Sequence, residues 1–321
     1  MGKNKFALLA AALVVISASA LALAALASSS DAVPGVVDGR VNVVATIFPQ
    51  YDFTRAVAAD RVNLSMLVRP GSEIHSFDPT PQDIISIRNA DLFIYIGGES
   101  DAWVDEILES IEASDMKILR LIDCVRAVPE ETVEGMQEED GEEGEDELDE
   151  HIWTAPTNAM VFVQVIADAL CDVDPGNADF YSANAERYIG DIASVDREIR
   201  DIVATAKRKK IVFGERFPFR YFTDLYGLKY SAAFPGCSTE SDVSAATMAY
   251  LIRTVENEDI PVVYTLELSG GNIARAIAEQ TGAEVRVLHS CHNLTKSDFE
   301  LGRTYVSIMR DNAESLRMGL N

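Results

Sequence analysis

The sequence predicts an α/β fold made of two doubly wound domains, each with a parallel sheet, which are joined by one long helix. Short apolar, β-branched segments alternate with helical segments in both halves of the chain, and this alternation is typical of a parallel sheet with helices on both faces. Between the halves, apolar residues recur at helical spacing over about thirty residues. The length of 321 residues also suits two domains better than one, because most domains contain about 100–200 residues.

The first half, residues 40–177, is expected to form the N-terminal α/β domain. We expect its strands at 41–47, 62–68, 92–96 and 117–121, and its helices at 51–59, 81–89, 103–111 and 157–169. Residues 130–150 interrupt this alternation with 13 acidic residues and no basic one. Because a run of like charges repels itself and cannot form a core, we expect a solvated loop there; a weak metal-gathering tether is the alternative.

Residues 178–210 are expected to form the long helix that joins the domains. Apolar residues recur in it at three- and four-residue steps, at Tyr188, Ile192, Val195, Ile199 and Ile202. At 1.5 Å per residue this helix would be about 45 Å long, which suits a rigid strut. The C-terminal α/β domain is expected at 211–321. Its strands are expected at 211–214, 230–234, 262–266 and 285–288, and its helices at 218–225, 241–255, 271–280 and 297–317.

The first residues have the features of an export signal. Lys3 and Lys5 precede an uncharged stretch of 22 residues at 6–27, which ends in the small-x-small pattern of a cleavage site before Ser28. The same stretch is long enough to span a bilayer, so an uncleaved anchor is the alternative to a cleaved signal peptide. Residues 28–39 are expected to be a polar leader or tether. We therefore expect an exported protein, at the cell surface or in the periplasm.

The charge of the chain restricts its partners. It contains 27 basic and 52 acidic residues, which gives a formal net charge of −25. Phosphates attract basic surfaces and are repelled by acidic ones. The sequence therefore argues against nucleic acid and anionic lipid as partners, whereas cations, of which metal ions are the simplest, remain suitable.

The four cysteines are Cys124, Cys171, Cys237 and Cys291. An even number of cysteines in an exported chain makes disulfides plausible. The predicted division into domains favours pairing Cys124 with Cys171 and Cys237 with Cys291, and four separate thiols are the alternative. No CxxC spacing occurs, which argues against a redox motif or a zinc knuckle.

Candidate metal ligands follow several of the predicted strands. His75 lies in the loop after the strand that ends at Val68, Glu215 and Glu267 come directly after two strands of the second half, and His289 follows the last strand. In an open parallel sheet, ligands bind beyond the carboxyl ends of the strands. These side chains are therefore expected to converge on one cleft between the domains.

Two further histidines and one carboxylate have their own expected roles at this site. His151 is expected to reach the cleft from the far side of the acidic run. His292 lies one turn after His289 and is expected to have at most a supporting role. Glu267 is either a ligand or a carboxylate that orients a histidine. Because no GxSxG, HExxH, P-loop or GxGxxG motif occurs, we do not expect an enzyme.

Two histidine motifs resemble those of the metal-specific substrate-binding proteins of ABC transporters, the zinc and manganese family. Residues 71–81 read GSEIHSFDPTP and are similar to the family's GxxxHxxxPxP signature, with His75 at the histidine. Residues 151–159 read HIWTAPTNA and resemble the motif HxWxxPxNA, with His151 at its start. Segments 90–97 and 219–228 add support, so the resemblance covers nearly all of the chain after the leader.

The resemblance implies four ligands, two of them at positions where this chain departs from the family pattern. The family's third ligand, a His or Glu, falls on Arg216. We expect Arg216 to turn away from the site, with Glu215 as the substitute ligand and Glu267 as the alternative. The family's fourth ligand, usually Asp, falls on His289. The expected set is His75, His151, Glu215 and His289. Three imidazoles and one carboxylate suit tetrahedral Zn²⁺, whereas more oxygen ligands would suit Mn²⁺.

The resemblance further implies a monomeric, bilobed receptor that holds one Zn²⁺ between its domains and delivers it to an ABC permease and its ATPase. A manganese receptor is the first alternative. A surface adhesin or metal scavenger with the same fold is the second, and a permease gene beside this one would distinguish it from a transporter component. A zinc hydrolase would need an open coordination position, which a full set of four ligands does not leave.

Overall fold

Two parallel sheets of four short strands form the centre of the structure, which is a computed structural model. It describes residues 39–72, 77–111, 115–137, 148–238 and 242–321. The first sheet has the order β2-β1-β3-β4 and the second the order β6-β5-β7-β8. Their strands are β1 Asn42–Ala45, β2 Asn63–Met66, β3 Leu92–Tyr95, β4 Lys117–Arg120, β5 Lys210–Phe213, β6 Lys229–Ser231, β7 Val262–Thr265 and β8 Glu284–Val287. In each sheet the order reverses beside the first strand, which is where ligands bind in open α/β sheets.

Helices follow most of the strands, as the alternating pattern predicts. The helices of the first half are α2 Phe48–Ala58, α3 Pro81–Arg88, α4 Ala102–Ser110, α5 Pro156–Val173 and α6 Ala178–Thr205. Those of the second half are α7 Arg220–Tyr226, α8 Ala245–Asn257, α9 Asn272–Thr281, α10 Lys296–Glu300 and α11 Tyr305–Leu320. Short 3₁₀ segments η1 Glu99–Asp101, η2 Leu121–Cys124, η3 Ile152–Thr154 and η4 Pro175–Asn177 complete the order. The predicted fold class is confirmed.

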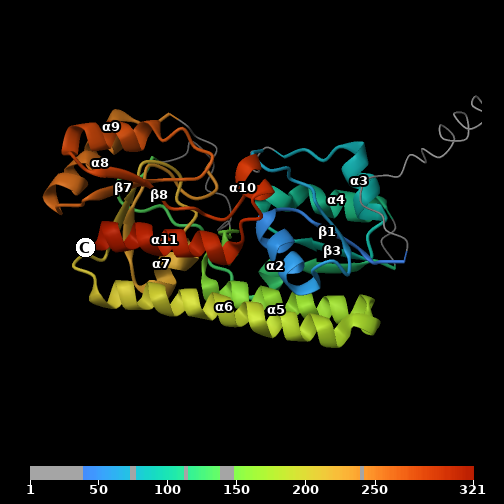
Figure 1. Cartoon of the computed structure of the whole chain (residues 1–321). Helices are drawn as coiled ribbons and strands as arrows, with labels where there is room; N and C mark the ends of the chain where they lie inside the picture. The colour runs from blue at the N-terminus through green and yellow to red at the C-terminus, as the bar shows by residue number, and fades with distance from the viewer. Residues whose placement is uncertain (1–38, 73–76, 112–114, 138–147, 239–241) are drawn as a thin grey trace, which may run out of the picture. The chain divides into compact units, whose positions relative to one another are not determined.

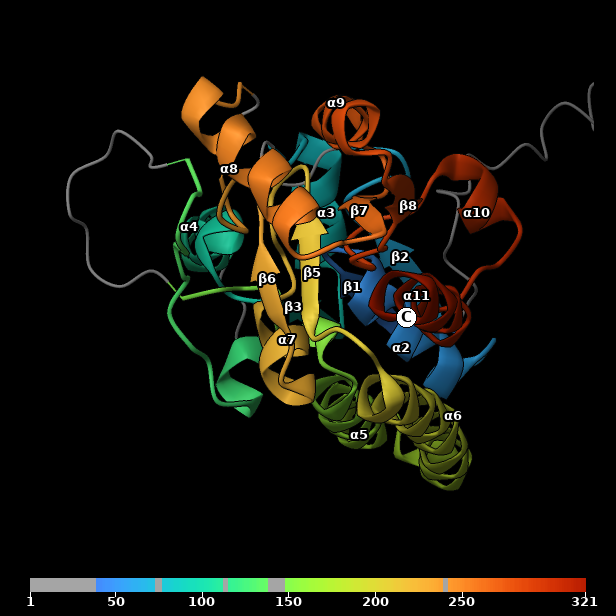
Figure 2. The ribbon, with the colours of Figure 1, turned by 90° about the vertical axis from the view of Figure 1, so that its left-hand side faces the viewer.

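The long helix α6 spans both halves, as Figure 1 shows. Its 28 residues give a length of about 42 Å. One face packs on α5 and α2 beside the first sheet, and its later turns pack on α11 beside the second sheet; Figure 2 views the same packing along the helices. Tyr188, Ile192, Val195 and Ile199 form the buried stripe on this face, as their spacing predicts.

The hydrophobic core is continuous between the two sheets. One cluster of buried side chains extends from Val43 in β1 through Trp153 to Phe213 in β5 and Tyr264 in β7. Smaller clusters lie on the outer side of each sheet. Because the central core is shared, residues 41–321 form one compact unit, and the domain boundaries expected at 177 and 210 stay a prediction.

The prediction of a single helix at 297–317 is wrong, because two helices, α10 and α11, occupy this stretch. Gly302 lies between them with a φ of 69°, a left-handed conformation that ends a helix. Thr304 then starts α11 with a capping box: Ser307 N donates to Thr304 Oγ1, and Thr304 N donates to Ser307 Oγ. Local backbone signals therefore override the continuous apolar pattern.

The acidic run is not solvated along its whole length, which corrects the expectation for residues 130–150. Residues 128–137, which we call the strap, pack against the second sheet and its helices. Glu130 Oε1 accepts a hydrogen bond from Cys237 N at 2.7 Å, and Gln137 N donates to Ala233 O at 2.9 Å. Met136 is buried in the central core. Residues 138–147 lie outside the described part of the chain.

The expected disulfides are not formed, since all four cysteines are free thiols. The reason is that the members of each expected pair contact different partners. Cys124 Sγ lies 3.7 Å from Arg120 O, whereas Cys171 Sγ lies 3.6 Å from Ala178 O. Cys291 is fully buried in the core, and Cys237 lies beside the strap.

The expected export signal and nearly all of the expected tether lie outside the described residues. Within the part of the chain that the structure describes, no helix combines the length and the apolar character needed to cross a bilayer.

Candidate metal site

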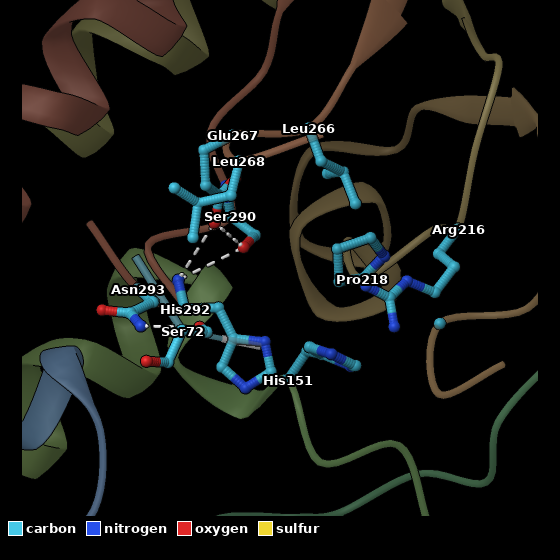
Figure 3. Close-up of a pocket in the computed structure, with 11 residues that line it drawn as sticks. Ser72, His151, Arg216, Pro218, Leu266, Glu267, Leu268, Ser290, His292 and Asn293 are labelled. Carbon is cyan, nitrogen blue, oxygen red and sulfur yellow. Dashed lines mark hydrogen bonds between the residues drawn. The ribbon is translucent and has the colours of Figure 1, made fainter. Parts of the chain in front are cut away.

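A small pocket of about 50 Å³ lies beyond the carboxyl ends of the strands and has walls from both halves of the chain. Ser72 and His151 come from the first half, and Arg216, Glu267 and His292 come from the second. Figure 3 shows the imidazoles of His151 and His292 near each other at one side of this pocket. The convergence at the strand ends agrees with the position expected from the sequence.

His151 is held rigidly at the start of η3. Its side chain is completely buried, and its Nδ1 lies 3.0 Å from Asp149 Oδ1. The backbone N of His151 donates to the same oxygen at 2.8 Å. When Nδ1 carries the proton that this carboxylate accepts, Nε2 has the lone pair that a metal ion needs.

The electrostatic environment of His151 is acidic. Burial by itself lowers the pKa of this imidazole, but the charge and hydrogen bond of Asp149, together with the charges of Glu150 and Glu130, outweigh burial and raise the pKa above its usual value. Carboxylates that favour a positive charge on the ring also favour a cation bound to the ring.

His292 lies in a tight turn after β8. Its ring centroid is 5.3 Å from that of His151 and 4.8 Å from that of Trp153. The backbone N of His292 donates to Glu267 Oε1 at 3.3 Å and to Ser290 Oγ at 3.2 Å. Trp153 Nε1 donates to Ser290 O at 2.8 Å. The turn is therefore fixed from both halves of the chain.

A carboxylate completes a cluster with the two imidazoles. One oxygen of Glu150 and one ring nitrogen each of His151 and His292 all lie within 4.8 Å of one another. Glu150 and His151 are buried, and His292 is partly buried. Two imidazoles and a carboxylate are ligands that divalent transition metals, and zinc in particular, accept in proteins.

Only some of the ligands that the sequence predicts lie at the pocket. His75 lies outside the described residues and stays a predicted ligand. The chain leading to it does reach the pocket, because Ser72 lines the wall and Asn293 Nδ2 donates to Ser72 O at 2.9 Å. Glu267 also lines the pocket, but it accepts from Ser290 and His292, so it acts as the carboxylate that supports the turn.

Glu215 and His289 are turned to other surroundings. Glu215 accepts from Thr265 Oγ1 at 2.9 Å and from Leu266 N at 3.2 Å. His289 Nδ1 accepts from Cys291 N at 2.9 Å, and the residue lines a separate cavity of about 390 Å³ beside α11. The structure thus places His292, and not His289, beside His151.

Arg216 points into the pocket, where Figure 3 shows its side chain on the wall opposite Glu267. Its Nη1 donates to Ser238 O at 3.3 Å. A guanidinium cannot ligate a metal ion because it has no free electron pair to donate. Because Arg216 lines the pocket, the expectation that it turns away from the site is wrong.

Sequence reasoning missed Glu150 and assigned His292 only a supporting role. Glu150 is the last residue of the acidic run and was expected to be solvated with it. His292 and His289 lie three residues apart in one loop, so the sequence offered two candidate histidines for the same pocket. The sequence did not show which one.

Comparisons with known proteins show the family to which the chain belongs. Residues 43–319 match the family model described as ZnuA, the periplasmic zinc-uptake complex component A. The chain is 30% identical over 306 residues to the zinc-binding lipoprotein AdcA of Streptococcus pneumoniae strain R6, with 95% of this chain and 60% of the relative covered. The chain thus spans about 60% of the length of that relative.

One further relative and one solved domain structure are matched over nearly their whole length. The chain is 29% identical over 323 residues to the high-affinity zinc uptake system protein ZnuA of Bacillus subtilis, with 96% of this chain and 97% of the relative covered. The crystal structure of the Zn(II)-bound ZnuA-like domain of S. pneumoniae AdcA matches with a TM-score of 0.74 at 28% identity, over 88% of this chain and 99% of that one.

Proposed function

The chain belongs to the family of the zinc-uptake complex component A, and we propose that it captures one divalent metal ion, Zn²⁺ in preference to Mn²⁺, outside the cytoplasm and delivers it to an ABC transporter. The observation that carries this proposal is the meeting of His151 and His292 in one pocket with ring centroids 5.3 Å apart. The printed names of the relatives, which describe zinc binding and zinc uptake, support the choice of zinc.

We infer that His151 and His292 ligate the ion through imidazole nitrogen. Asp149 bonds the ring of His151, and Glu267 bonds the backbone N of His292. A carboxylate on the ring, such as Asp149, fixes the ligand geometry and raises ligand basicity, whereas Glu267 fixes the turn that carries His292. His75 is proposed as a further ligand, from the histidine motif in which it stands.

The transport partner follows from the family. A receptor with one enclosed ion needs a membrane permease to receive the ion and an ATPase to drive its passage. We propose these two partners for this chain, with the metal ion as cargo and no turnover of its own.

The test compares three histidines in zinc titrations of the purified protein. His151→Ala and His292→Ala should each remove most of the zinc-induced rise in melting temperature, because a ligand bound only by the folded state stabilises it by RT ln(1 + [L]/Kd), about 2.7 kcal/mol at 100 Kd. His289→Ala is the matched control and should retain the rise.

Competition with a chromophoric chelator measures the zinc affinity of the same variants independently of their own stability. Loss of affinity in His289→Ala with normal affinity in His292→Ala would contradict the assignment. Failure of the unmodified protein to bind zinc or manganese would contradict the proposed function as a whole.

A further inference from the structure

We propose that Glu150 is a direct ligand of the metal ion and supplies the carboxylate that the site lacks at Arg216. This inference rests on the proposed function and adds to it the identity of the oxygen ligand. Neither the family motif nor the strand-end pattern points to Glu150, because the residue precedes the motif histidine and belongs to the acidic run.

The distances suit a shared ion. The ligand atoms of Glu150, His151 and His292 lie within 4.8 Å of one another. Around a tetrahedral zinc with bonds of about 2.1 Å, ligand atoms are about 3.4 Å apart. The three ligand atoms therefore need to approach one another by about 1.4 Å at most.

The carboxylate is held in place by neutral donors. Ser100 N donates to Glu150 Oε2 at 3.1 Å, and Ser100 Oγ donates to Oε1. A Cβ on Gly98 would lie 2.5 Å from Oε2, so only glycine lets the backbone approach this oxygen. A carboxylate has about four lone-pair positions, so a carboxylate that accepts two hydrogen bonds can also ligate a metal ion.

The charges in the pocket favour the same assignment. Glu150 is only 3% exposed, and a positive charge nearby stabilises a carboxylate at a buried position when it is ionised. Arg216 brings a fixed positive charge into the pocket that His151 and His292 also line. A nearby anionic ligand offsets the repulsion between that guanidinium and an incoming dication.

The sequence context explains how one carboxylate replaces another. Glu150 is covalently next to His151, so the backbone that places this imidazole also places the carboxylate. The two ligands then come from consecutive residues that Asp149 and Ser100 hold on either side. Position 216 can therefore be an arginine without removing the oxygen ligand from the site.

The experiment compares Glu150→Gln with Glu131→Gln. Both variants remove one carboxylate charge from the acidic run, and Glu131 is exposed and lies outside the three-residue cluster. Chelator competition should show zinc binding weakened more than about 100-fold in Glu150→Gln, beyond the 10–100-fold typical of outer residues, and changed only a few-fold in Glu131→Gln. With Co²⁺ in place of zinc, the visible ligand-field spectrum should change in Glu150→Gln alone.

A second measurement keeps the inference testable if Glu150→Gln does not fold. In a crystal structure of the unaltered zinc-loaded protein, a Glu150 oxygen should lie about 2.0–2.2 Å from the ion. A Glu150 oxygen farther than about 3 Å from a bound zinc would overturn the inference. So would zinc binding that Glu150→Gln leaves intact while His151→Ala and His292→Ala abolish it, and in that case the proposed function would stand.

Discussion

The backbone conformation of Cys291 decides which histidine of the loop after β8 faces the proposed metal pocket. Cys291 lies between the two candidates with a φ of 62°, a left-handed conformation that reverses the chain locally. Asn312 of α11 holds His289 at both its backbone N and its backbone O. His289 is thereby fixed toward α11, and the reversal at Cys291 carries His292 to His151.

Asp101, a buried carboxyl near the site, contributes to the pH dependence of stability. Asp101 Oδ2 accepts from Ile96 N at 2.9 Å and from Gly97 N at 3.0 Å. Burial raises the pKa of Asp101 to about 6, and the charge of Glu150 adds to this rise. Because the folded pKa lies above the unfolded value of 3.8, the folded state disfavours the charged form.

Asp101→Asn should therefore stabilise the metal-free protein at pH 7.5 and alter its pH profile. The unaltered protein should gain stability as the pH falls from about 6 to about 4, by at most about 3 kcal/mol for a shift of about two units. The asparagine has no charge to bury and retains an oxygen for both N–H groups, so this gain should be absent. Urea unfolding at pH 4.5, 6 and 7.5 measures both effects, and a variant less stable than the original at pH 7.5 would contradict them.

At the scale of elements, the acidic run joins the two halves at its ends. Tyr221 on α7 connects these ends: its Oη donates to Asp149 O at 2.6 Å and accepts from Val128 N at 3.1 Å. Glu131 of the strap forms an ion pair with Arg220 of α7 and accepts from Tyr230 Oη at 3.1 Å. Hydrogen bonds and an ion pair thus hold the run at both ends, and one of these bonds, at Asp149 O, lies two residues before His151.

Tyr221→Phe should lower the free energy of unfolding by about 1–3 kcal/mol, because it leaves a partly buried N–H and a buried C=O without their side-chain partner. Tyr230→Phe is the matched control. It removes a bond to the exposed Glu131 carboxylate, which water can replace, so its effect should be smaller. Urea unfolding of the metal-free proteins measures the difference, and equal losses in the two variants would contradict a special role for Tyr221.

Sequence patterns predicted which helices and strands the chain forms better than they predicted the boundaries and the contacts of these elements. Apolar periodicity located the strands and the long helix because burial on one face has a repeating signature. The break at Gly302 and the packing of Met136 had no such signature, since each depends on one turn or one neighbouring element. Charge counting likewise described the acidic run as a whole. It did not show that Asp149 and Glu150 are buried or that Glu130 accepts a hydrogen bond from Cys237 N.

The proposed metal ligands show the same limit. His151 was predicted from its motif, and its position in the pocket agrees with that prediction. Glu150 and His292 come together only through tertiary contacts, in which Ser100 holds the first and Glu267 the turn of the second. No pattern along the chain contains those contacts.

At the scale of the whole molecule, buried hydrogen bonds tie the two sheets together around the metal pocket. Asp52 in α2 is completely buried and accepts from Tyr188 Oη of α6 and from Tyr305 N of α11. Tyr305 Oη donates to Trp153 O at 2.9 Å, and Trp153 Nε1 donates to Ser290 O. Separation of the sheets would break these bonds and expose the shared core.

Metal binding should therefore change the dimensions of the protein only slightly. A wide hinge motion would require α6 to bend and would leave Asp52 and Trp153 without buried partners, at a cost of several kcal/mol. We expect the radius of gyration, about 19 Å for a compact unit of this size, to differ by less than about 1 Å between metal-free and zinc-loaded protein, as in other preorganised binding proteins. Small-angle X-ray scattering of one preparation before and after zinc addition measures this difference. His151→Ala treated in the same way is the control for effects of zinc outside the pocket. A zinc-dependent decrease of several ångströms in the unaltered protein alone would show that the two sheets close like a hinge and that α6 does not restrain them.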